Sequence, residues 1–283
     1  MGRDVGQSVA VTVAGEVRAT NAAGVVAAGA SVGVLGGLIG LGGAEFRLPL
    51  LIGVFGFAAL SAVILNKAMS LIVVVTALPV RLTAIPYGEL SPHWNVVVNL
   101  LAGSLVGAWM GATAATRMRT ATLYRVLTVL LVLIALVLVG THLGTVDGLG
   151  LDGPVQIVAG VIAGFLIGLA AAVMGVAGGE LLIPTIVLLY GIDVKTAGSL
   201  SLMVSLPTMV AAFARYSRDG SFVVLRIERR FVVLMALGSI AGTIIGGLLA
   251  GVVSEGVLIP LLGALLLISA VNVWRHAAPA ERA

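Results

Sequence analysis

Apolar stretches long enough to cross a lipid bilayer recur along this chain, separated by short polar loops. A membrane helix needs about 20 consecutive apolar residues. Stretches of roughly this length run at 62–80, 94–115, 123–142, 197–214, 231–253 and 256–274. This pattern predicts an all-α integral membrane protein.

Two further apolar segments, 22–57 and 154–191, are too long for a single crossing. Each carries a glycine cluster, one acidic residue and a proline near its middle, Pro49 in the first and Pro184 in the second. Proline removes a helical hydrogen bond and glycine weakens a helix, so such a segment is expected to break and turn. We therefore predict that each segment forms a helical hairpin, with its break at the glycines and the proline.

These two segments open an internal repeat with an offset of 135 residues. The matching positions are Gly29, Gly33, Gly40, Gly43, Glu45, Pro49 and Gly56 with Gly164, Gly168, Gly175, Gly178, Glu180, Pro184 and Gly191, and Gly103, Ser104, Gly107 and Gly111 with Gly238, Ser239, Gly242 and Gly246. The predicted organisation is a polar N-terminal segment (1–21), two transmembrane repeats (22–146 and 154–275), an external linker (147–153) and a C-terminal tail (276–283).

The charged loops predict how the repeats are oriented. Basic residues gather on the cytoplasmic side of a membrane, and here they cluster at 117–125, at 215–230 and at both ends of the chain. These regions share one side only if each long segment enters the membrane and returns. The two halves are then inverted relative to each other, with roughly eight to ten transmembrane helices in total. We expect a multi-pass protein of a bacterial inner membrane with both termini in the cytoplasm.

Composition agrees with this class and excludes others. The chain is 60% hydrophobic and only 10% charged, with a mean hydropathy of +1.18, which a soluble domain could not bury. The net charge of +4 is spread over loops and forms no basic stripe of the kind that binds nucleic acid. There is no cysteine, no pair of histidines at metal-ligand spacing and no visible nucleophile–base pair. We therefore expect neither an enzyme nor a metal or other cofactor.

The glycine clusters are the first candidate for chemistry. A break inside a membrane helix leaves peptide N–H groups without partners, and it is tolerated only inside protein or beside a cavity. N–H groups at the start of the resuming helix form an anion site, which points to Gly42, Gly43, Gly178 and Gly179 as substrate-binding residues. The alternative is that these glycines only let helices pack closely.

Two acidic residues, Glu45 and Glu180, follow the glycine clusters in apolar surroundings. Ionisable residues in such places are usually functional, and proton coupling is one hypothesis. Capping of the N–H groups at the break is the structural alternative, and both remain open. Arg47 lies two residues beyond Glu45, and its counterpart in the second half is Leu182. Arg47 is therefore either a partner of Glu45 or a substrate contact that exists in one half only.

Polar residues on the helices that follow the hairpins complete the candidate site. Lys67, beside Asn66, is the best single candidate for an anion contact, although a lysine near a helix end can also extend to the membrane surface. In the second half Ser199 and Ser201 form part of a hydroxyl-rich face. Such hydroxyls line polar cavities or bond to their own helix.

At these residues the chain resembles the sulfite exporter TauE/SafE family of membrane permeases. The resemblance rests on the paired glycine-rich signatures at 40–49 and 175–184 and on Asn66-Lys67, and it spans about residues 22–274. It implies transport of small sulfur-containing anions such as sulfite, sulfoacetate or related organosulfonates, coupled to protons. The expected partners are the anion, protons and membrane lipid, and whether two copies form a homodimer stays open. The competing hypothesis is a cation carrier or channel that uses Glu45 and Glu180.

Overall fold

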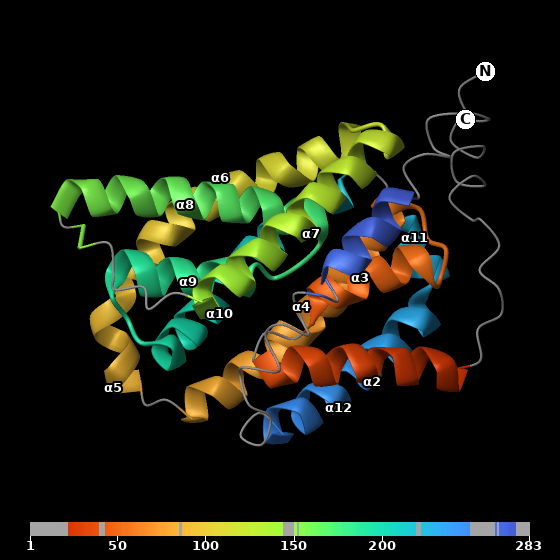
Figure 1. Cartoon of the computed structure of the whole chain (residues 1–283), viewed down its shortest axis with the longest axis horizontal. Helices are drawn as coiled ribbons and strands as arrows, with labels where there is room; N and C mark the ends of the chain where they lie inside the picture. Colours follow the sequence, from red (N-terminus) through yellow and green to blue (C-terminus); the bar gives the residue numbers. More distant parts are fainter. Residues whose placement is uncertain are drawn as a thin grey trace.

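The computed structural model describes residues 22–39, 43–84, 87–143, 150–151, 153–218, 222–249, 264 and 266–275. Every regular element within these ranges is a helix, as Figure 1 shows. The elements are α2 (Ala22–Ile39), α3 (Ala44–Gly53), α4 (Ala59–Ala84), α5 (Tyr87–Leu90), the 3-10 helix η1 (Ser91–His93), α6 (Trp94–Arg117), α7 (Thr120–Leu143), α8 (Gly153–Met174), α9 (Gly179–Tyr190), α10 (Val194–Ser217), α11 (Val223–Ile227) and α12 (Arg229–Leu249), followed by a helix at Leu266–Arg275.

The helices confirm the predicted all-α membrane class. Within the described part of the chain, 5 helices are long and apolar enough to cross a membrane: Ser91–Arg117, Thr120–Val137, Gly153–Met174, Thr196–Ser217 and Arg229–Gly246. Their outward faces carry exposed apolar side chains such as Val129, Leu136 and Ile162, which suits contact with lipid. Most of the predicted stretch at 256–274 lies outside the described residues.

Both long segments break and return, as their length predicts. In the second half, Gln156 near the start of α8 donates to the Leu189 carbonyl near the end of α9 (2.8 Å). In the first half, α2 runs parallel to α12, and Phe55, just beyond α3, stacks edge-on against Phe231 near the start of α12, with ring centroids 4.9 Å apart. The end of each short helix therefore lies back beside the start of the helix that precedes it.

The prediction placed each break at both the glycines and the proline, and it is wrong for the prolines. The described glycines Gly43 and Gly178 have left-handed backbones immediately before α3 and α9, whereas Pro49 and Pro184 each lie inside the following helix as its sixth residue. A proline there cannot donate to the carbonyl four residues earlier, which belongs to Glu45 in α3 and to Glu180 in α9. Each helix tolerates this single missing bond near its first turn, so the prolines modify the helix without ending it.

The two halves exchange helices. Figure 1 shows α2 beside α12 and, on the opposite side of the molecule, α6 beside α8. A Cβ added to Gly33 would collide with the Ser239 carbonyl, and one added to Gly168 would collide with the Ser104 carbonyl. These two contacts map onto each other under the offset of 135, with the halves swapped. The glycines therefore permit the close approach of each half's first helix to the other half's last helix.

Contacts between the helices bear on the predicted inversion of the two halves. Tyr124 at the start of α7 hydrogen-bonds to the backbone of Ala59 at the start of α4, so the end of α6, the start of α4 and the start of α2 share one end of the molecule. Because α8 runs parallel to α6, it begins at the other end. Inversion of the halves relative to a membrane stays a prediction, and these directions support it.

Two of the predicted basic regions lie at the same end of the molecule. Arg215 near the end of α10 donates through Nε to the Thr113 hydroxyl of α6 (2.7 Å). The Arg218 guanidinium lies 4.8 Å from the ring centroid of Trp109. The loops at 117–125 and 215–230 therefore begin beside each other, which is the arrangement that the charge pattern predicted. The side of the membrane that they face remains a prediction.

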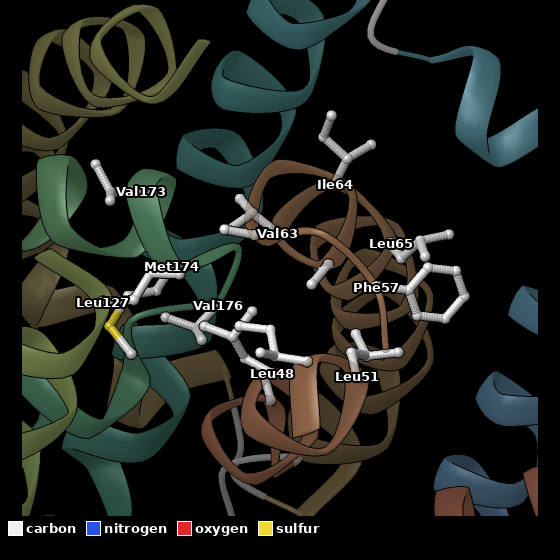
Figure 2. Close-up of a cluster of buried hydrophobic side chains, with 14 of the residues drawn as sticks. Leu48, Leu51, Phe57, Val63, Ile64, Leu65, Leu127, Val173, Met174 and Val176 are labelled. Atoms are coloured by element: carbon white, nitrogen blue, oxygen red, sulfur yellow. The ribbon is translucent and has the colours of Figure 1, made fainter. Parts of the chain in front are cut away.

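The hydrophobic core surrounds the two breaks (Figure 2). It brings together buried side chains from α3, α4, α7, α8 and the turn after α8, among them Leu48, Leu51, Val63, Leu65, Leu127, Val173, Met174 and Val176. Residues of both halves contribute to this single cluster. The core therefore holds the first hairpin against the second at the centre of the molecule.

Candidate functional site

The two breaks have the same backbone conformation at equivalent glycines. Gly43 and Gly178 both adopt left-handed conformations, with φ of 70° and 85°, immediately before α3 and α9. Gly175, at the start of the second break, has φ of 73°, and a Cβ there would collide with the Val63 carbonyl. Only glycine meets both demands without strain. Gly42 lies outside the described residues, and Gly179 is the first residue of α9.

The helix starts at the breaks are not capped by side chains. Gly43 and Gly178 precede the two helices and have no side chain that could cap them, so the first N–H groups of α3 and α9 need other partners. Glu45 and Glu180 are the second residues of the two helices. Within the described part of the chain, the buried oxygens of both carboxylates have no hydrogen-bond partner. The Glu45 carboxylate does interact with the backbone N–H of its own residue, so capping of the first break stays a prediction.

Arg47 is the most extensively bonded polar residue near the breaks. It is fully buried, and its guanidinium donates to the Asn66 side-chain oxygen (3.4 Å), the Ser70 hydroxyl (3.3 Å) and the Ser239 hydroxyl (3.2 Å). The side chain thus joins α3 to α4 in its own half and to α12 in the other half. The opposite charges of Arg47 and Glu45 also attract each other, which is the pairing that the sequence suggested.

Asn66 links the two breaks directly. Its side-chain amide donates to the Ala44 carbonyl at the first break (3.0 Å) and to the Met174 carbonyl at the second (3.3 Å). Its oxygen accepts from Arg47. All of this lies in the protein interior, where an unsatisfied polar group is costly. One side chain therefore ties the two hairpins together at the point where both are interrupted.

Lys67 lies at the second break and does not reach a surface. It is 1% exposed, and its ammonium donates to the carbonyls of Ala171 (3.0 Å) and Val176 (2.6 Å). The alternative of a lysine that extends to the membrane surface is therefore wrong. The ammonium is held on the carbonyl side of the break, at the end of α8, and the N–H side of the break lies at the start of α9.

The serines of α10 differ in what their hydroxyls do. Ser201 donates to the Gly198 carbonyl of its own helix (2.8 Å), which is the structural alternative for such residues. Ser199 and Ser205 are fully buried, and their hydroxyls have no partner among the described residues. Ser205 is the counterpart of Ser70 under the repeat. Of the two predicted serines, Ser199 is thus the one with an available hydroxyl.

The sequence missed two contributors to this site. Ser70 accepts from Arg47 and donates to the Gly175 carbonyl (3.5 Å), and Tyr216 donates to the Ala172 carbonyl (3.0 Å). A lone serine or tyrosine in an apolar helix gives no distinctive signal. The spacing of Asn66 and Ser70, four residues apart on one helix face, was the available clue.

A comparison with known families identifies the chain. A model of the sulfite exporter TauE/SafE family matches residues 6–138 and 159–282, which is nearly the whole sequence. No curated protein and no solved structure matched the chain. Family membership implies a multi-pass membrane transporter of sulfite or related sulfur-containing anions, in agreement with the apolar helices described above. The chain belongs to the sulfite exporter TauE/SafE family.

Proposed function

We propose that this protein exports a small sulfur-containing anion, such as sulfite, sulfoacetate or a related organosulfonate, through a site between the two breaks. The observation that carries the proposal is the presence of two buried basic side chains at the breaks. Arg47 of α3 donates to the Asn66 side chain, and Lys67, which follows Asn66 on α4, donates to the Ala171 carbonyl at the end of α8. Buried charges are expensive in a membrane and usually serve transport. An anion bound nearby would offset that cost.

The proposed binding site combines N–H groups with these charges. The backbone of Gly42, Gly43, Gly178 and Gly179 would supply N–H groups at the positive ends of α3 and α9. Asn66, Ser199 and Ser201 would supply hydrogen bonds to the anion oxygens, although Ser201 would first have to release its bond to Gly198. Arg47 and Lys67 would set the positive potential from behind the breaks.

Proton coupling is assigned to Glu45 and Glu180. A carboxyl group that is buried without a hydrogen-bond partner is best suited to gain and lose a proton as its surroundings change. Alternating access of the site, with inverted halves in a bacterial inner membrane and both termini in the cytoplasm, completes the proposal. Inverted repeats with broken helices at the midplane are a common arrangement in such carriers.

The test is transport by purified protein in liposomes. Efflux of sulfite, sulfoacetate and related sulfonates is followed with and without an imposed pH gradient, and then for Glu45→Gln and Glu180→Gln. A coupling residue should lose gradient-driven efflux and keep exchange of labelled anion across the membrane, because exchange needs no net proton movement. Loss of both activities in a stable variant would assign that glutamate to structure or binding instead.

The two carboxylates, whose buried oxygens have no hydrogen-bond partner among the described residues, also support a second candidate, a cation carrier or channel that uses Glu45 and Glu180. The same liposomes distinguish the two functions. A cation carrier should move simple cations, should depend on both glutamates and should be indifferent to Arg47→Leu. An anion carrier should lose sulfite efflux in Arg47→Leu, and should tolerate Leu182→Met at the equivalent position of the second half.

A further inference from the structure

We propose that the end of α8 forms a binding site for a monovalent cation, and that the ammonium of Lys67 permanently fills it. The ammonium lies between the carbonyl oxygens of Ala171 (3.0 Å) and Val176 (2.6 Å), and the side chain is 1% exposed. Among the described residues its hydrogen-bond partners are these two backbone carbonyls.

Several carbonyls at the end of α8 and in the turn after it accept hydrogen bonds from side chains of other helices. A helix end carries partial negative charge, because its last carbonyls lack helical donors. Here Tyr216 donates to the Ala172 carbonyl, Asn66 to that of Met174 and Ser70 to that of Gly175. The Ala172 carbonyl also accepts the Gly175 N–H (3.2 Å). The Ala171 carbonyl also accepts the Val176 N–H (3.1 Å), so Lys67 uses its second lone pair. Neutral donors thus bond to the carbonyls of Ala172, Met174 and Gly175, and a charged donor bonds to those of Ala171 and Val176.

The ligands are those that an exchangeable metal ion would use. In secondary transporters with interrupted helices, exposed carbonyls at a half-helix end coordinate the coupling cation. The Lys67 ammonium supplies the same charge as such an ion. Because it is covalently attached to the chain, it cannot dissociate and cross the membrane with a substrate. We therefore infer that wild-type transport does not use an alkali cation at this site. This inference concerns the cation side of the break and does not depend on which anion the protein carries.

The repeat provides a matched position without the site. The counterpart of Lys67 is Leu202, which packs with Val74, Ala177 and Met209 in an apolar cluster. Shortening Leu202 should open a cavity of the same general kind without exposing a pair of carbonyls to it. A selective cation response at position 67 and not at position 202 would therefore come from the carbonyls.

The experiment measures the thermal unfolding midpoint of detergent-purified protein at matched ionic strength. The salts are the chlorides of ammonium, methylammonium, sodium and choline, and the proteins are wild type, Lys67→Ala, Lys67→Met and Leu202→Ala. Lys67→Ala should unfold at a lower temperature in choline, and ammonium or methylammonium should restore about 2–4 °C, the shift that a binding free energy of about 1 kcal/mol produces in a chain of this size. Wild type, Lys67→Met and Leu202→Ala should not distinguish these cations.

Three outcomes would overturn the proposal. Lys67→Ala could respond equally to all four salts, which would make Lys67 a packing residue. Formamide, a neutral N–H donor, could restore it as well as ammonium does, which would show that charge is not required. Selective stabilisation of the wild type by sodium would show that an exchangeable cation binds despite Lys67. This measurement uses only the wild-type protein, so it does not depend on whether a variant folds. Because the readout is stability, failure of the sulfur-anion proposal would leave the result interpretable.

Discussion

The two breaks share their backbone and differ in their charged side chains. Both have a left-handed glycine, an acidic second residue and a proline as the sixth residue of the resuming helix. The residues that bond across the site differ, with Arg47, Asn66 and Lys67 in the first half and Leu182, Ser201 and Leu202 in the second. The repeat thus supplies two similar breaks, and one half supplies the basic side chains that surround them.

Electrostatics explains why the basic residues are not duplicated. Taking a charge out of water costs several kcal/mol even after the protein relaxes, and a symmetric site would bury two arginines and two lysines in the same core. The first half places one of each against hydroxyl, amide and carbonyl oxygens. The second half fills the matching positions of Arg47 and Lys67 with leucine. An asymmetric site keeps the positive potential at half the cost in buried charge.

The largest expected effect comes from the shared backbone. Gly175→Ala should destabilise the protein by about 3 kcal/mol or more, since it combines a left-handed φ with a collision at the Val63 carbonyl. Gly191→Ala is the matched control, because Gly191 also has positive φ (66°) but has open space around it. It should cost about 1 kcal/mol. Equal unfolding midpoints for the two variants would contradict the role assigned to the close contact.

Arg47→Leu tests whether the arginine that only the first half carries is needed for anion binding. The variant places leucine at position 47, as the second half has at the equivalent position 182. Loss of its three hydrogen bonds should cost about 2 kcal/mol of stability, because their buried acceptors lose a charged donor. The anion should also bind at least roughly tenfold more weakly, the factor that corresponds to about 1.4 kcal/mol. Titration of detergent-purified protein with sulfite measures the effect. Unchanged affinity in a folded variant would remove Arg47 from the site.

Asn66→Ala compared with Ser201→Ala tests the link between the breaks. Asn66→Ala leaves the Ala44 and Met174 carbonyls without its amide, and should cost about 2 kcal/mol in denaturation experiments. Ser201 bonds only to its own helix among the described residues, so Ser201→Ala should cost less than about 0.5 kcal/mol. A reversed order would mean that the second half, and not the first, joins the hairpins.

The smallest effect is expected for another equivalent pair, Ser70 and Ser205. Ser70→Ala removes a bond from Arg47 and one to Gly175, and should cost about 1 kcal/mol. Ser205→Ala removes a buried hydroxyl that has no partner in the described structure, so it should be neutral or slightly stabilising. A clear loss of stability in Ser205→Ala would reveal a bonded water or ligand at that hydroxyl.

Local patterns in the sequence predicted the helices and the breaks well. Length and hydropathy located α6, α7, α10 and α12, and the glycine clusters placed both breaks. The prolines were misassigned because their missing hydrogen bond falls near the start of a helix, where its loss is tolerated. Lys67 and Asn66 were singled out because polar residues are rare in apolar helices.

The bonding partners of these residues were beyond sequence reasoning. Arg47 meets Ser239, and Lys67 meets Ala171 and Val176, across separations that no local periodicity encodes. The glycine faces of α2 and α12 were visible as small-residue patterns, but nothing in such a pattern says which other helix it will contact. Packing between distant segments decides that choice.

The exchange of helices between halves also constrains the order of assembly during synthesis. The α6–α8 pair can form soon after Leu169 leaves the ribosome, because Gly111 lies against it. Gly29 and Gly33 must wait for Met235 and Ser239, so α2 stays in the bilayer without its final neighbour until translation is almost complete. A chain truncated before α12 should therefore expose the small-residue face of α2, which makes this helix the natural point for membrane quality control to recognise an unfinished molecule.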